Sequence, residues 1–491
     1  MTSFKTENYL PETSDNLSLR VIFFDKNQHC ISDSSLYSHD DINAIASHLK
    51  NLGFSSKNPV VIPISDDNTY YYCTQIDVSL KQHQYSMQAV GASIFKYFHQ
   101  SGFTFLEVIW PSYETLPKPD LLGLDDFAQC LSNIYKGILS ADYSFTHYKK
   151  DKNTQPKPAY SLSHVWINQE DLQKRFNTVK STLIGEQLAK DLMNEPPNVL
   201  TPVAFSNRIK MLEKYGLEVD ILDEKRLEEE NMHALLSVGQ GSTHQSRLAC
   251  MRWQGATTAD SRPLVLVGKG VCFDSGGINI KLSQLTDMKY DMGGAASVVG
   301  AMASIAALKI PTNVVGIVAL TENMPGGKAY RPSDIISSRS GKKIEVLNTD
   351  AEGRLILADA IDYATDLKPR AIVDLATLTG AIIVALGHEY AGLFCNDAPL
   401  LNHIQKASEN SGEKIWHMPL DNEYDTLIDS PIADVQNLSA QGGKAGSVTA
   451  AQFLQRFTKD FPWAHIDIAG TAWIPSDNAV HPKGPTGYGV S

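Results

Sequence analysis

Residues 343–361 contain a strand-like segment, a short charged turn and a helix-like segment in immediate succession. Residues 343–347 (KIEVL) are typical of a strand, and residues 355–361 (LILADAI) are typical of the start of a helix. The turn between them carries Asp350, Glu352 and Arg354. Open α/β sheets place their ligand sites at the carboxyl ends of their strands. This segment therefore predicts an α/β fold with a charged site at the end of a strand.

The charges of the turn indicate what the site binds. If the backbone there is extended, side chains two residues apart point the same way, so we expect Asp350, Glu352 and Arg354 to share one side. Two carboxylates that close together are costly unless a positive charge lies between them, and a divalent cation commonly fills that role. The turn therefore predicts a metal site.

A second charged cluster lies upstream. Residues 263–267 form a short apolar run that predicts a buried strand, and a glycine-rich segment follows it. Glycines allow the backbone to approach a ligand closely. The two clusters together offer two lysines, an arginine and four carboxylates, with no histidine. Such an oxygen-rich set suits paired Zn, Mn or Mg ions better than a single structural zinc. The carboxylates are those of Asp274, Asp291, Asp350 and Glu352, and the lysines are Lys269 and Lys281.

The composition limits the class of protein. A chain of 491 residues can form two or three domains, each with its own core. The net charge of −12 argues against general affinity for nucleic acid or for an anionic membrane. The first residues lack the apolar core of a signal peptide, and we find no run of about 18 apolar residues. Six scattered cysteines without a C-x-x-C pair fit reduced thiols. These features predict a cytoplasmic protein with no membrane partner.

The order of expected elements divides the chain into three parts. Strand-like and helix-like segments alternate in the first part, which indicates an α/β domain with a largely parallel sheet. Residues 169–194 follow a helical pattern that ends before Pro196. We therefore expect an N-terminal α/β domain at residues 1–165, a linking helix at 166–195 and a catalytic domain at 196–491. In the first part, strands are expected at residues 17–24, 60–64 and 103–110, and helices at 41–52, 85–100 and 125–139.

The second half repeats the α/β pattern on a larger scale. Thr201 followed by Pro202 predicts the start of a helix, which Gly216 ends. A helix of small residues is expected at 293–307. Successive buried strands end in polar or glycine-rich turns, as expected where one sheet edge gathers a site. The predicted fold class is α/β. We expect a smaller N-terminal α/β domain and a larger C-terminal α/β catalytic domain with a mixed, largely parallel central sheet. Strands are expected at residues 217–222, 248–253, 313–320, 371–376 and 464–470.

Residues 348–355 (NTDAEGRL) resemble the signature octapeptide of the leucyl aminopeptidases, the cytosol aminopeptidase family of two-metal exopeptidases. The likeness covers residues 180–491, whereas the N-terminal part matches only in length and α/β character. Two departures are visible: Cys272 stands where the family more often has threonine, and the segment between Lys281 and Asp291 is one residue shorter. Further blocks that resemble the family lie at residues 194–198, 267–281, 289–296, 371–380 and 463–470.

The resemblance implies a role for each charged residue. It implies that Lys269, Asp274, Asp291 and Glu352 hold one metal ion. Asp274, Asp350 and Glu352 would hold the other, with help from the Asp350 carbonyl. It further implies that Lys281 polarises the scissile carbonyl. Arg354 would anchor a bicarbonate that acts as general base, helped by backbone near Leu378, and Met288 would line the pocket for the first side chain.

The resemblance also implies the activity. We expect a homohexameric metallo-aminopeptidase that removes N-terminal residues, preferentially bulky apolar ones, from peptides. N-acetylated substrates should be refused, because a free substrate amine would coordinate a metal. Two alternatives remain: a non-catalytic scaffold or DNA-binding member of the family, and a dipeptidase for Cys-Gly-type substrates. The intact charged set and the negative net charge favour the enzyme. Met288 could instead be a core residue, and His465, inside an apolar strand, is expected to be one.

Overall fold

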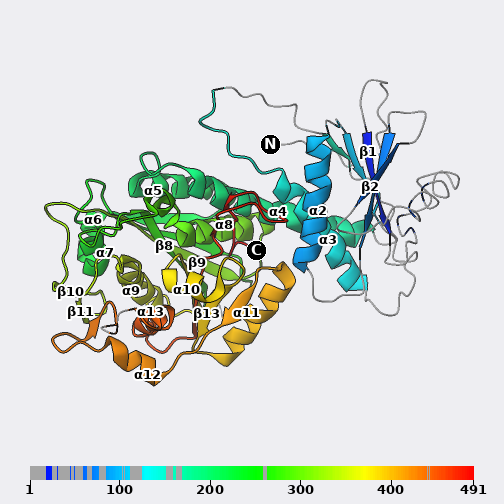
Figure 1. Ribbon diagram of the computed structural model, residues 1–491. Helices are drawn as coiled ribbons and strands as arrows, with labels where there is room; N and C mark the ends of the chain where they lie inside the picture. The colour runs from blue at the N-terminus through cyan, green and yellow to red at the C-terminus, as the bar shows by residue number, and fades with distance from the viewer. Residues whose placement is uncertain are drawn as a thin grey trace. The chain divides into compact units, whose positions relative to one another are not determined.

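The computed structural model forms two compact units (Figure 1). The smaller unit comprises Met1–Lys180 and Asp477–Pro482, and the larger unit comprises Ser181–Ser476 and Lys483–Ser491. The structure describes residues 18–24, 30, 32, 45, 49, 59–63, 69–76, 84–101, 103, 105–110, 124–150, 159–161, 169–257, 262–439, 441 and 443–491.

The smaller unit is built on a five-stranded sheet in the order β2-β3-β1-β4-β5. β1 pairs in parallel with β3 and β4, and β4 with β5, whereas β2 runs antiparallel to β3. Two helices, α2 (Gln84–Gln100) and α3 (Leu124–Ala141), pack against each other. The strands are β1 (Ser18–Phe24), β2 (Val60–Pro63), β3 (Thr69–Gln75), β4 (Phe105–Val108) and β5 (Ala159–Ser161).

Most elements expected in this unit are confirmed, with ends that shift by a few residues. The strands expected at residues 17–24, 60–64 and 103–110 correspond to β1, β2 and β4. The helices expected at 85–100 and 125–139 correspond to α2 and α3. The helix expected at 41–52 lies mostly outside the described residues, although Ile45 and Leu49 are helical and buried.

Helix α4 (Gln169–Asn194) has the bounds that its apolar periodicity predicts. Its buried residues include Phe176, Leu183 and Leu192. The helix ends shortly before Pro196. Its first residues, up to Lys180, belong to the smaller unit, and the rest belong to the larger unit.

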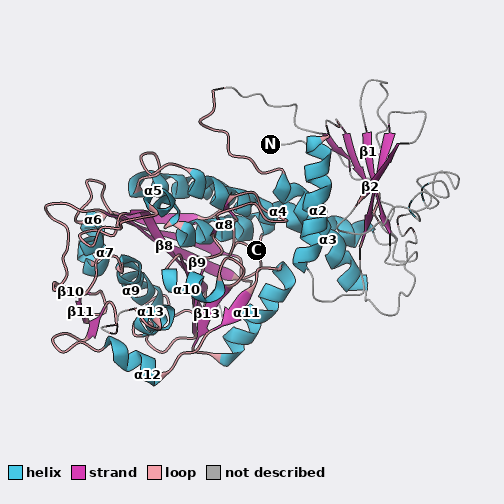
Figure 2. Cartoon of the chain, in the orientation of Figure 1, coloured by secondary structure: helices cyan, strands magenta, loops and turns pink. Residues whose placement is uncertain are grey.

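The larger unit is organised around an eight-stranded sheet in the order β14-β13-β16-β12-β8-β9-β7-β6 (Figure 2). Its centre is parallel, because β8 runs parallel to both β9 and β12, and β12 runs parallel to β16. β7 and β6 on one side and β13 on the other introduce antiparallel pairs. The sheet is therefore mixed and parallel at its centre, as predicted. The strands are β6 (Glu218–Leu222), β7 (Arg247–Gln254), β8 (Leu264–Asp274), β9 (Asn313–Asn323), β12 (Ala371–Ala376), β13 (Ala391–Cys395), β14 (Ile415–His417) and β16 (Trp463–Asp467).

Helices cover both faces of this sheet (Figure 1). α8 (Gly293–Leu308) and α9 (Glu352–Thr365) belong to two different apolar clusters. Alternate residues of β9 enter these clusters: Ile317 packs with α9, and Val318 packs with α8. Because both faces are buried, the central strands are continuous apolar runs.

Helix α8 lies very close to the sheet. A Cβ atom at Gly294 would come within 2.1 Å of the Leu375 carbonyl oxygen, and one at Gly268 would come within 2.7 Å of the Ala295 Cα. Only glycine fits at such distances. The small residues expected at 293–307 therefore bring this helix against the strands.

Shorter elements complete the larger unit. Thr201 caps α5 (Pro202–Lys210) by accepting a hydrogen bond from the Ala204 amide, as predicted, and Gly216 ends the following turn with φ of 88°. A small sheet has the order β10-β11-β15. The other elements are α6 (Glu224–Glu229), α7 (His233–Gly239), β10 (Ile335–Ser337), β11 (Lys343–Glu345), α10 (Gly380–Leu386), α11 (Ala398–Ser411), α12 (Asn422–Asp425), β15 (Val435–Gln436), α13 (Gly446–Gln455), β17 (Trp473–Ile474) and β18 (Gly484–Pro485).

One stretch of the described chain, Leu285–Leu308, is long and apolar enough by composition to cross a membrane. Its most apolar part is 72% buried inside the protein. The stretch contains α8, which packs on the central sheet, so its apolar character is that of a core helix.

Candidate active site

The predicted site residues converge at the carboxyl ends of the central parallel strands. β8 ends at Asp274, and β9 ends beside it at Asn323, its register partner. Thr377 and Leu378 follow the end of β12, which is the other neighbour of β8. The turn that precedes α9 brings the octapeptide to the same edge. The site therefore lies where the strand-end rule places it.

Three carboxylates form the centre of the site. One oxygen atom each of Asp274, Asp350 and Glu352 lies within 4.8 Å of the others. Asp274 and Glu352 are buried, and Asp350 is partly buried. Lys281 joins two of them, since its Nζ lies 2.8 Å from Asp274 Oδ2 and also pairs with Asp350.

The fourth carboxylate, that of Asp291, joins the cluster through Lys269. The Lys269 Nζ lies 2.8 Å from Asp291 Oδ1 and 3.0 Å from Glu352 Oε1, and it donates to the Thr377 carbonyl at 2.8 Å. Thr377 also donates its hydroxyl to Asp291 Oδ1 at 2.9 Å. Four carboxylates drawn from distant parts of the chain thus share two ammonium groups.

The conformation of the octapeptide differs from the expectation. Thr349 and Asp350 lie in a turn, and α9 begins at Glu352, so the assumption of an extended segment is wrong. Glu352 and Arg354 lie in the first turn of the helix. The side chains still meet, because helix and turn together direct Asp350 and Glu352 to the same carboxylate cluster.

Gly353 is required by this arrangement, and sequence reasoning gave it no role. A Cβ atom at Gly353 would lie 2.6 Å from Lys269 Cε and 2.8 Å from Lys269 Nζ. The Lys269 side chain therefore passes directly over the backbone of the first helical turn. Only glycine leaves room for it there.

Burial and like charge perturb the pKa values of the acidic groups. Burial, with the Glu352 charge, raises the pKa of Asp274 to about 7, although Lys281 and Lys269 oppose the rise. Burial also raises the pKa of Asp291 well above its usual value, against the effect of Lys269. The ionised carboxylates of Asp274 and Asp291 are thus poorly stabilised without further positive charge.

The pKa values of the two lysines are also raised, which favours their charged form. Burial lowers the pKa of Lys269, but the carboxylates of Asp291 and Glu352 outweigh burial and hold that pKa above its usual value. The same balance, with Asp274 and Glu352 as the main partners, raises the pKa of Lys281. Both amines are therefore protonated at neutral pH in the protein alone.

Unused oxygen atoms show that the residues fit a metal ion. Among the described residues, the buried atoms Asp291 Oδ2 and Glu352 Oε2 have no hydrogen-bond partner. Buried polar atoms are rarely left without a partner unless a ligand or water supplies one. Carboxylate oxygens are ligands for divalent cations such as Zn, Mn and Mg. The site therefore fits one or more divalent cations.

Arg354 lies in the same region, two residues after Glu352. Its side chain is buried, and within the described part of the chain its Nε and Nη1 atoms have no hydrogen-bond partner. Burial lowers the pKa of this guanidinium to about 10, against the charges of Glu352 and Asp467. The guanidinium stays charged at neutral pH and offers unused donors to an anion.

Met288, expected to line the pocket for the first side chain, and Leu378, near the backbone expected to help hold the bicarbonate, are both partly buried. Met288 lies in a short 3₁₀ helix (Leu285–Tyr290) that ends just before Asp291. Leu378 follows Thr377, and its amide donates to Asp467 Oδ1 at 3.1 Å. This amide is therefore engaged by a carboxylate. His465 is fully buried and bonded to Asp374 at 2.6 Å, as expected for a core histidine.

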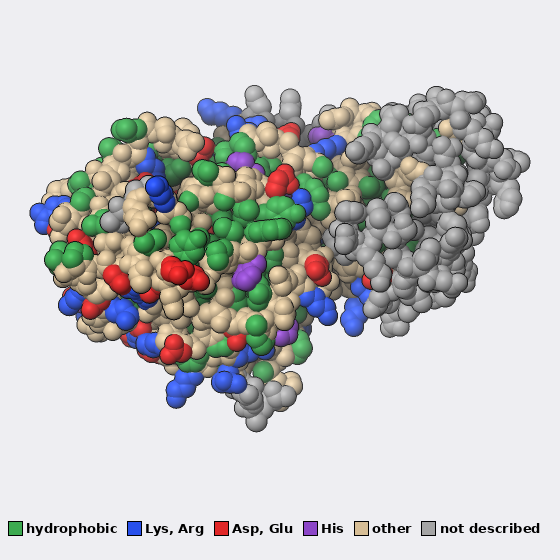
Figure 3. Space-filling view, turned by 60° about the horizontal axis from the view of Figure 1, so that its bottom comes forward, with side chains coloured by type: hydrophobic (Ala, Val, Ile, Leu, Met, Phe, Trp, Pro, Cys, Tyr) green, Lys and Arg blue, Asp and Glu red, His purple; other side chains and the backbone are tan. Residues whose placement is uncertain are grey.

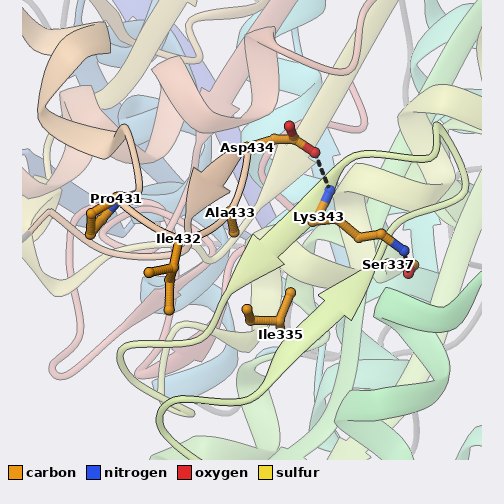
Figure 4. A pocket seen from close by; sticks show the side chains of 7 residues that line it. All are labelled: Ile335, Ser337, Lys343, Pro431, Ile432, Ala433 and Asp434. Carbon is orange, nitrogen blue, oxygen red and sulfur yellow. Dashed lines mark hydrogen bonds between the residues drawn. The ribbon is translucent and has the colours of Figure 1, made fainter.

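A surface pocket lies elsewhere in the larger unit, on the small sheet (Figure 4). Its volume is about 530 Å³, and it is lined by Ile335, Ile432 and Lys343 among others. The Lys343 backbone amide donates to Asp434 at 2.7 Å across it. None of the predicted site residues lines this pocket, so it is not part of the candidate site.

The chain is similar to known proteins over most of its length. A profile described as "Cytosol aminopeptidase family, catalytic domain" matches residues 187–491. A probable cytosol aminopeptidase of Rhizobium leguminosarum bv. trifolii is 48% identical over 376 residues, which cover 76% of this chain and 75% of that protein. A probable cytosol aminopeptidase of Ehrlichia ruminantium is 47% identical over 394 residues, which cover 78% of each chain.

Solved structures extend the comparison to the whole fold. The bottromycin maturation enzyme BotP is similar with a TM-score of 0.80 and 28% sequence identity, over 96% of each chain. BotP in complex with Mn has a TM-score of 0.81, over 96% of this chain and 97% of that one. The match therefore includes the part of the chain that precedes residue 187.

Proposed function

The chain belongs to the cytosol aminopeptidase family and is therefore a metal-dependent aminopeptidase that acts on peptides. We propose that it uses two divalent cations and prefers bulky apolar N-terminal residues. Family membership confirms the resemblance drawn from the octapeptide, and with it the assignment as a hydrolase. One observation carries the proposal: four carboxylates meet at one sheet edge, and two of their buried oxygen atoms have no hydrogen-bond partner among the residues that the structure describes.

We assign the ligands by residue. Lys269, Asp274, Asp291 and Glu352 would hold one cation, and Asp274, Asp350 and Glu352, with the Asp350 carbonyl, would hold the other. When bound, the cations would act as Lewis acids toward the peptide carbonyl and would lower the pKa of a water molecule, whose deprotonated form is the nucleophile that attacks this carbonyl. Zinc and manganese are the preferred candidates, and the complex of BotP with Mn supports manganese.

Two lysines would change their partners when cations bind. Lys281 pairs with Asp274 and Asp350 in the protein alone, so cations that neutralise these carboxylates would release its ammonium toward the substrate. There it would stabilise the negative charge that develops on the peptide oxygen. Lys269 must instead lose its proton to act as a ligand, because a protonated amine has no free electron pair.

Arg354 would hold the general base. Its buried guanidinium offers Nε and Nη1 to an anion, and bicarbonate is small enough to be held by one planar guanidinium. Bicarbonate bound there would accept the proton of the attacking water. Because the Leu378 amide already donates to Asp467, Arg354 is the main donor in this proposal.

Selectivity for the substrate would come from the free N-terminus and the first side chain. A free amine can coordinate a cation, whereas an acetylated amine cannot. Met288 and Leu378, both partly buried, are proposed to line the pocket for the first side chain.

We further propose a homohexamer in the cytoplasm. Apolar side chains gather in the middle of one face of the larger unit, and lysines and arginines lie mostly toward its edges (Figure 3). Exposed apolar residues in this unit include Leu282, which is 96% exposed, and Val384, which is 90% exposed. Such surface is favourable to cover with another subunit.

Removal and restoration of metal tests the function. The protein is dialysed against a chelator, and hydrolysis of Leu-p-nitroanilide is measured before and after addition of Zn or Mn. We expect loss and recovery of activity, with about two ions bound per chain. Recovery at one ion per chain would contradict the two-cation mechanism.

Matched substrates test the selectivity. Leu-amide should be hydrolysed and N-acetyl-Leu-amide refused, and equal turnover of the two would contradict the role of the free amine. A panel that includes Cys-Gly distinguishes a preference for bulky residues from a dipeptidase.

A further inference from the structure

Asn323 connects two segments of the candidate site. It is the last residue of β9, and its side chain is fully buried. Its Nδ2 donates to Asp274 Oδ1 at 2.8 Å and to the Thr349 carbonyl at 2.9 Å. The first acceptor belongs to a proposed ligand, and the second lies in the peptide unit that leads into Asp350.

The chemistry of its neighbours fixes the orientation of this amide. Both neighbours are oxygen acceptors, so the NH₂ group must face them, and a flipped amide would place three oxygens together. The Oδ1 atom points instead toward Gly277, where an added Cβ would lie 2.7 Å from it. Within the described residues this oxygen has no hydrogen-bond partner. Both amide hydrogens are thus used at the site.

The backbone carbonyl of Asn323 also binds the residue that follows Asp274. It accepts a hydrogen bond from the Ser275 amide at 3.0 Å and one from the Ser275 hydroxyl at 2.7 Å. Ser275 directly follows Asp274. Side chain and backbone of one residue therefore constrain the carboxylate of Asp274 and the chain that leaves it.

A second donor reaches the Thr349 carbonyl but not Asp274. The buried Tyr330 hydroxyl donates to this carbonyl at 2.6 Å. Tyr330 therefore shares one of the two contacts of Asn323 and lacks the other. A change at Tyr330 therefore removes a donor to the octapeptide and leaves the donors to Asp274 in place, whereas a change at Asn323 removes a donor to each.

We propose that Asn323 is a positioning residue that sets Asp274 and the Thr349–Asp350 peptide at the spacing that the cations require. The inference rests on the proposed two-cation function. A carboxylate with a fixed donor cannot turn its oxygens away from a cation, and the loss of such a donor commonly weakens metal binding 10- to 100-fold. Asn323 does not itself touch substrate or metal in this proposal.

Binding of Mn²⁺ to the metal-free full chain tests the proposal without any measurement of activity. The variants are Asn323→Leu, which replaces the amide by an apolar group of similar size, and Asn323→Ala, which leaves no bulk to clash with Gly277. Tyr330→Phe is the matched control. Free Mn²⁺ is followed by electron paramagnetic resonance during titration, and the unfolding temperature of each metal-free variant is recorded.

We expect both Asn323 variants to bind Mn²⁺ at least about tenfold more weakly than the wild type. Tyr330→Phe should stay within about threefold, because Asp274 keeps the Asn323 amide as a donor beside the Gly276 amide. The proposal is overturned if the Asn323 variants bind within threefold of the wild type, or if Tyr330→Phe weakens binding as much as they do. If Asn323→Leu does not fold, Asn323→Ala decides.

The wild type distinguishes this inference from the function on which it rests. A wild type that neither binds Mn²⁺ nor hydrolyses Leu-p-nitroanilide with it contradicts the proposed function itself. If the wild type binds Mn²⁺ and hydrolyses Leu-p-nitroanilide with it, and the Asn323 variants bind Mn²⁺ as tightly as the wild type, only the positioning role of Asn323 is contradicted.

Discussion

Replacement of Gly353 by alanine should reverse the usual effect of this substitution in a helix. Alanine normally stabilises a helix by up to about 1 kcal/mol relative to glycine. Here the new Cβ would lie 2.6 Å from Lys269 Cε, and ordinary contacts begin at 3.4 Å, so the lysine must move by about 0.8 Å. Its Nζ cannot move freely, because it holds Asp291, Glu352 and the Thr377 carbonyl at 2.8 to 3.0 Å.

The balance of these terms sets the expected magnitude. A hydrogen bond to a charged group contributes about 1.5–3 kcal/mol, so the loss of one already exceeds the gain in helix propensity. We expect Gly353→Ala to lower the free energy of unfolding of the metal-free chain by about 1–2 kcal/mol. We also expect kcat/KM to fall by about 100-fold, because a proposed metal ligand is displaced by nearly 1 Å.

Urea unfolding and hydrolysis of Leu-p-nitroanilide measure the two effects. Gly327→Ala is the control, since a Cβ at Gly327 meets nothing within 4 Å and should change neither quantity. If Gly353→Ala were more stable than the wild type and fully active, Lys269 could not lie against the first turn of α9, and the ligand set would have to be revised.

Three further outcomes test the charged groups. Lys281→Ala should lower kcat by about 100-fold or more while Mn²⁺ still binds, because the lysine acts on the substrate oxygen. If the affinity for Mn²⁺ fell as much as kcat, Lys281 would belong to the metal site instead. Arg354→Met should lower kcat and abolish any activation by added bicarbonate, and unchanged activation would refute the proposed base site. Binding of Mn²⁺ should strengthen from pH 6 to pH 8, because cations displace protons from Lys269, whose pKa is raised, and from Asp274, whose pKa is about 7. Calorimetry in buffers of different ionisation enthalpy would detect the released protons, and no release would contradict this reasoning.

The location of the site could be predicted from the sequence because strand ends are encoded locally. The apolar runs before Asp274 and Thr377 identify central strands, and parallel neighbours must end at the same edge of a sheet. A lysine or aspartate directly after such a run is therefore placed near the others without knowledge of the full fold. The same reasoning could have identified Asn323, but the expected strand ended at residue 320, three residues too early.

The detailed geometry could not be predicted, because it depends on contacts between distant segments. The prediction that Asp350, Glu352 and Arg354 share one side assumes an extended octapeptide, whereas Glu352 begins a helix. The close passage of Lys269 over Gly353 involves residues 84 positions apart, and no local pattern indicates it. Likewise, nothing in the sequence near Thr349 shows that Asn323 and Tyr330 both bind its carbonyl.

The buried pair of His465 and Asp374 provides a test of the core that does not depend on the proposed cations. Asp374 accepts from His465 Nδ1 at 2.6 Å and from Trp463 Nε1 at 2.7 Å, and all three side chains are fully buried. Burial lowers the pKa of His465, but the Asp374 carboxylate outweighs burial and raises that pKa above its usual value. The folded state thus binds the imidazole proton more tightly than the unfolded state does.

The sign of the pH dependence follows from this shift. Because the folded pKa is raised, the stabilisation is fully present below the unfolded value of about 6.5 and is lost as the pH rises through the folded value. His465→Gln should therefore lower the unfolding temperature most at about pH 6, and the difference from the wild type should shrink as the pH increases. Trp463→Phe removes the other donor to Asp374 without a titrating group, so its penalty should not change with pH in this way. A difference between wild type and His465→Gln that stayed constant, or grew, from pH 6 to pH 9 would show that His465 is neutral in the folded protein.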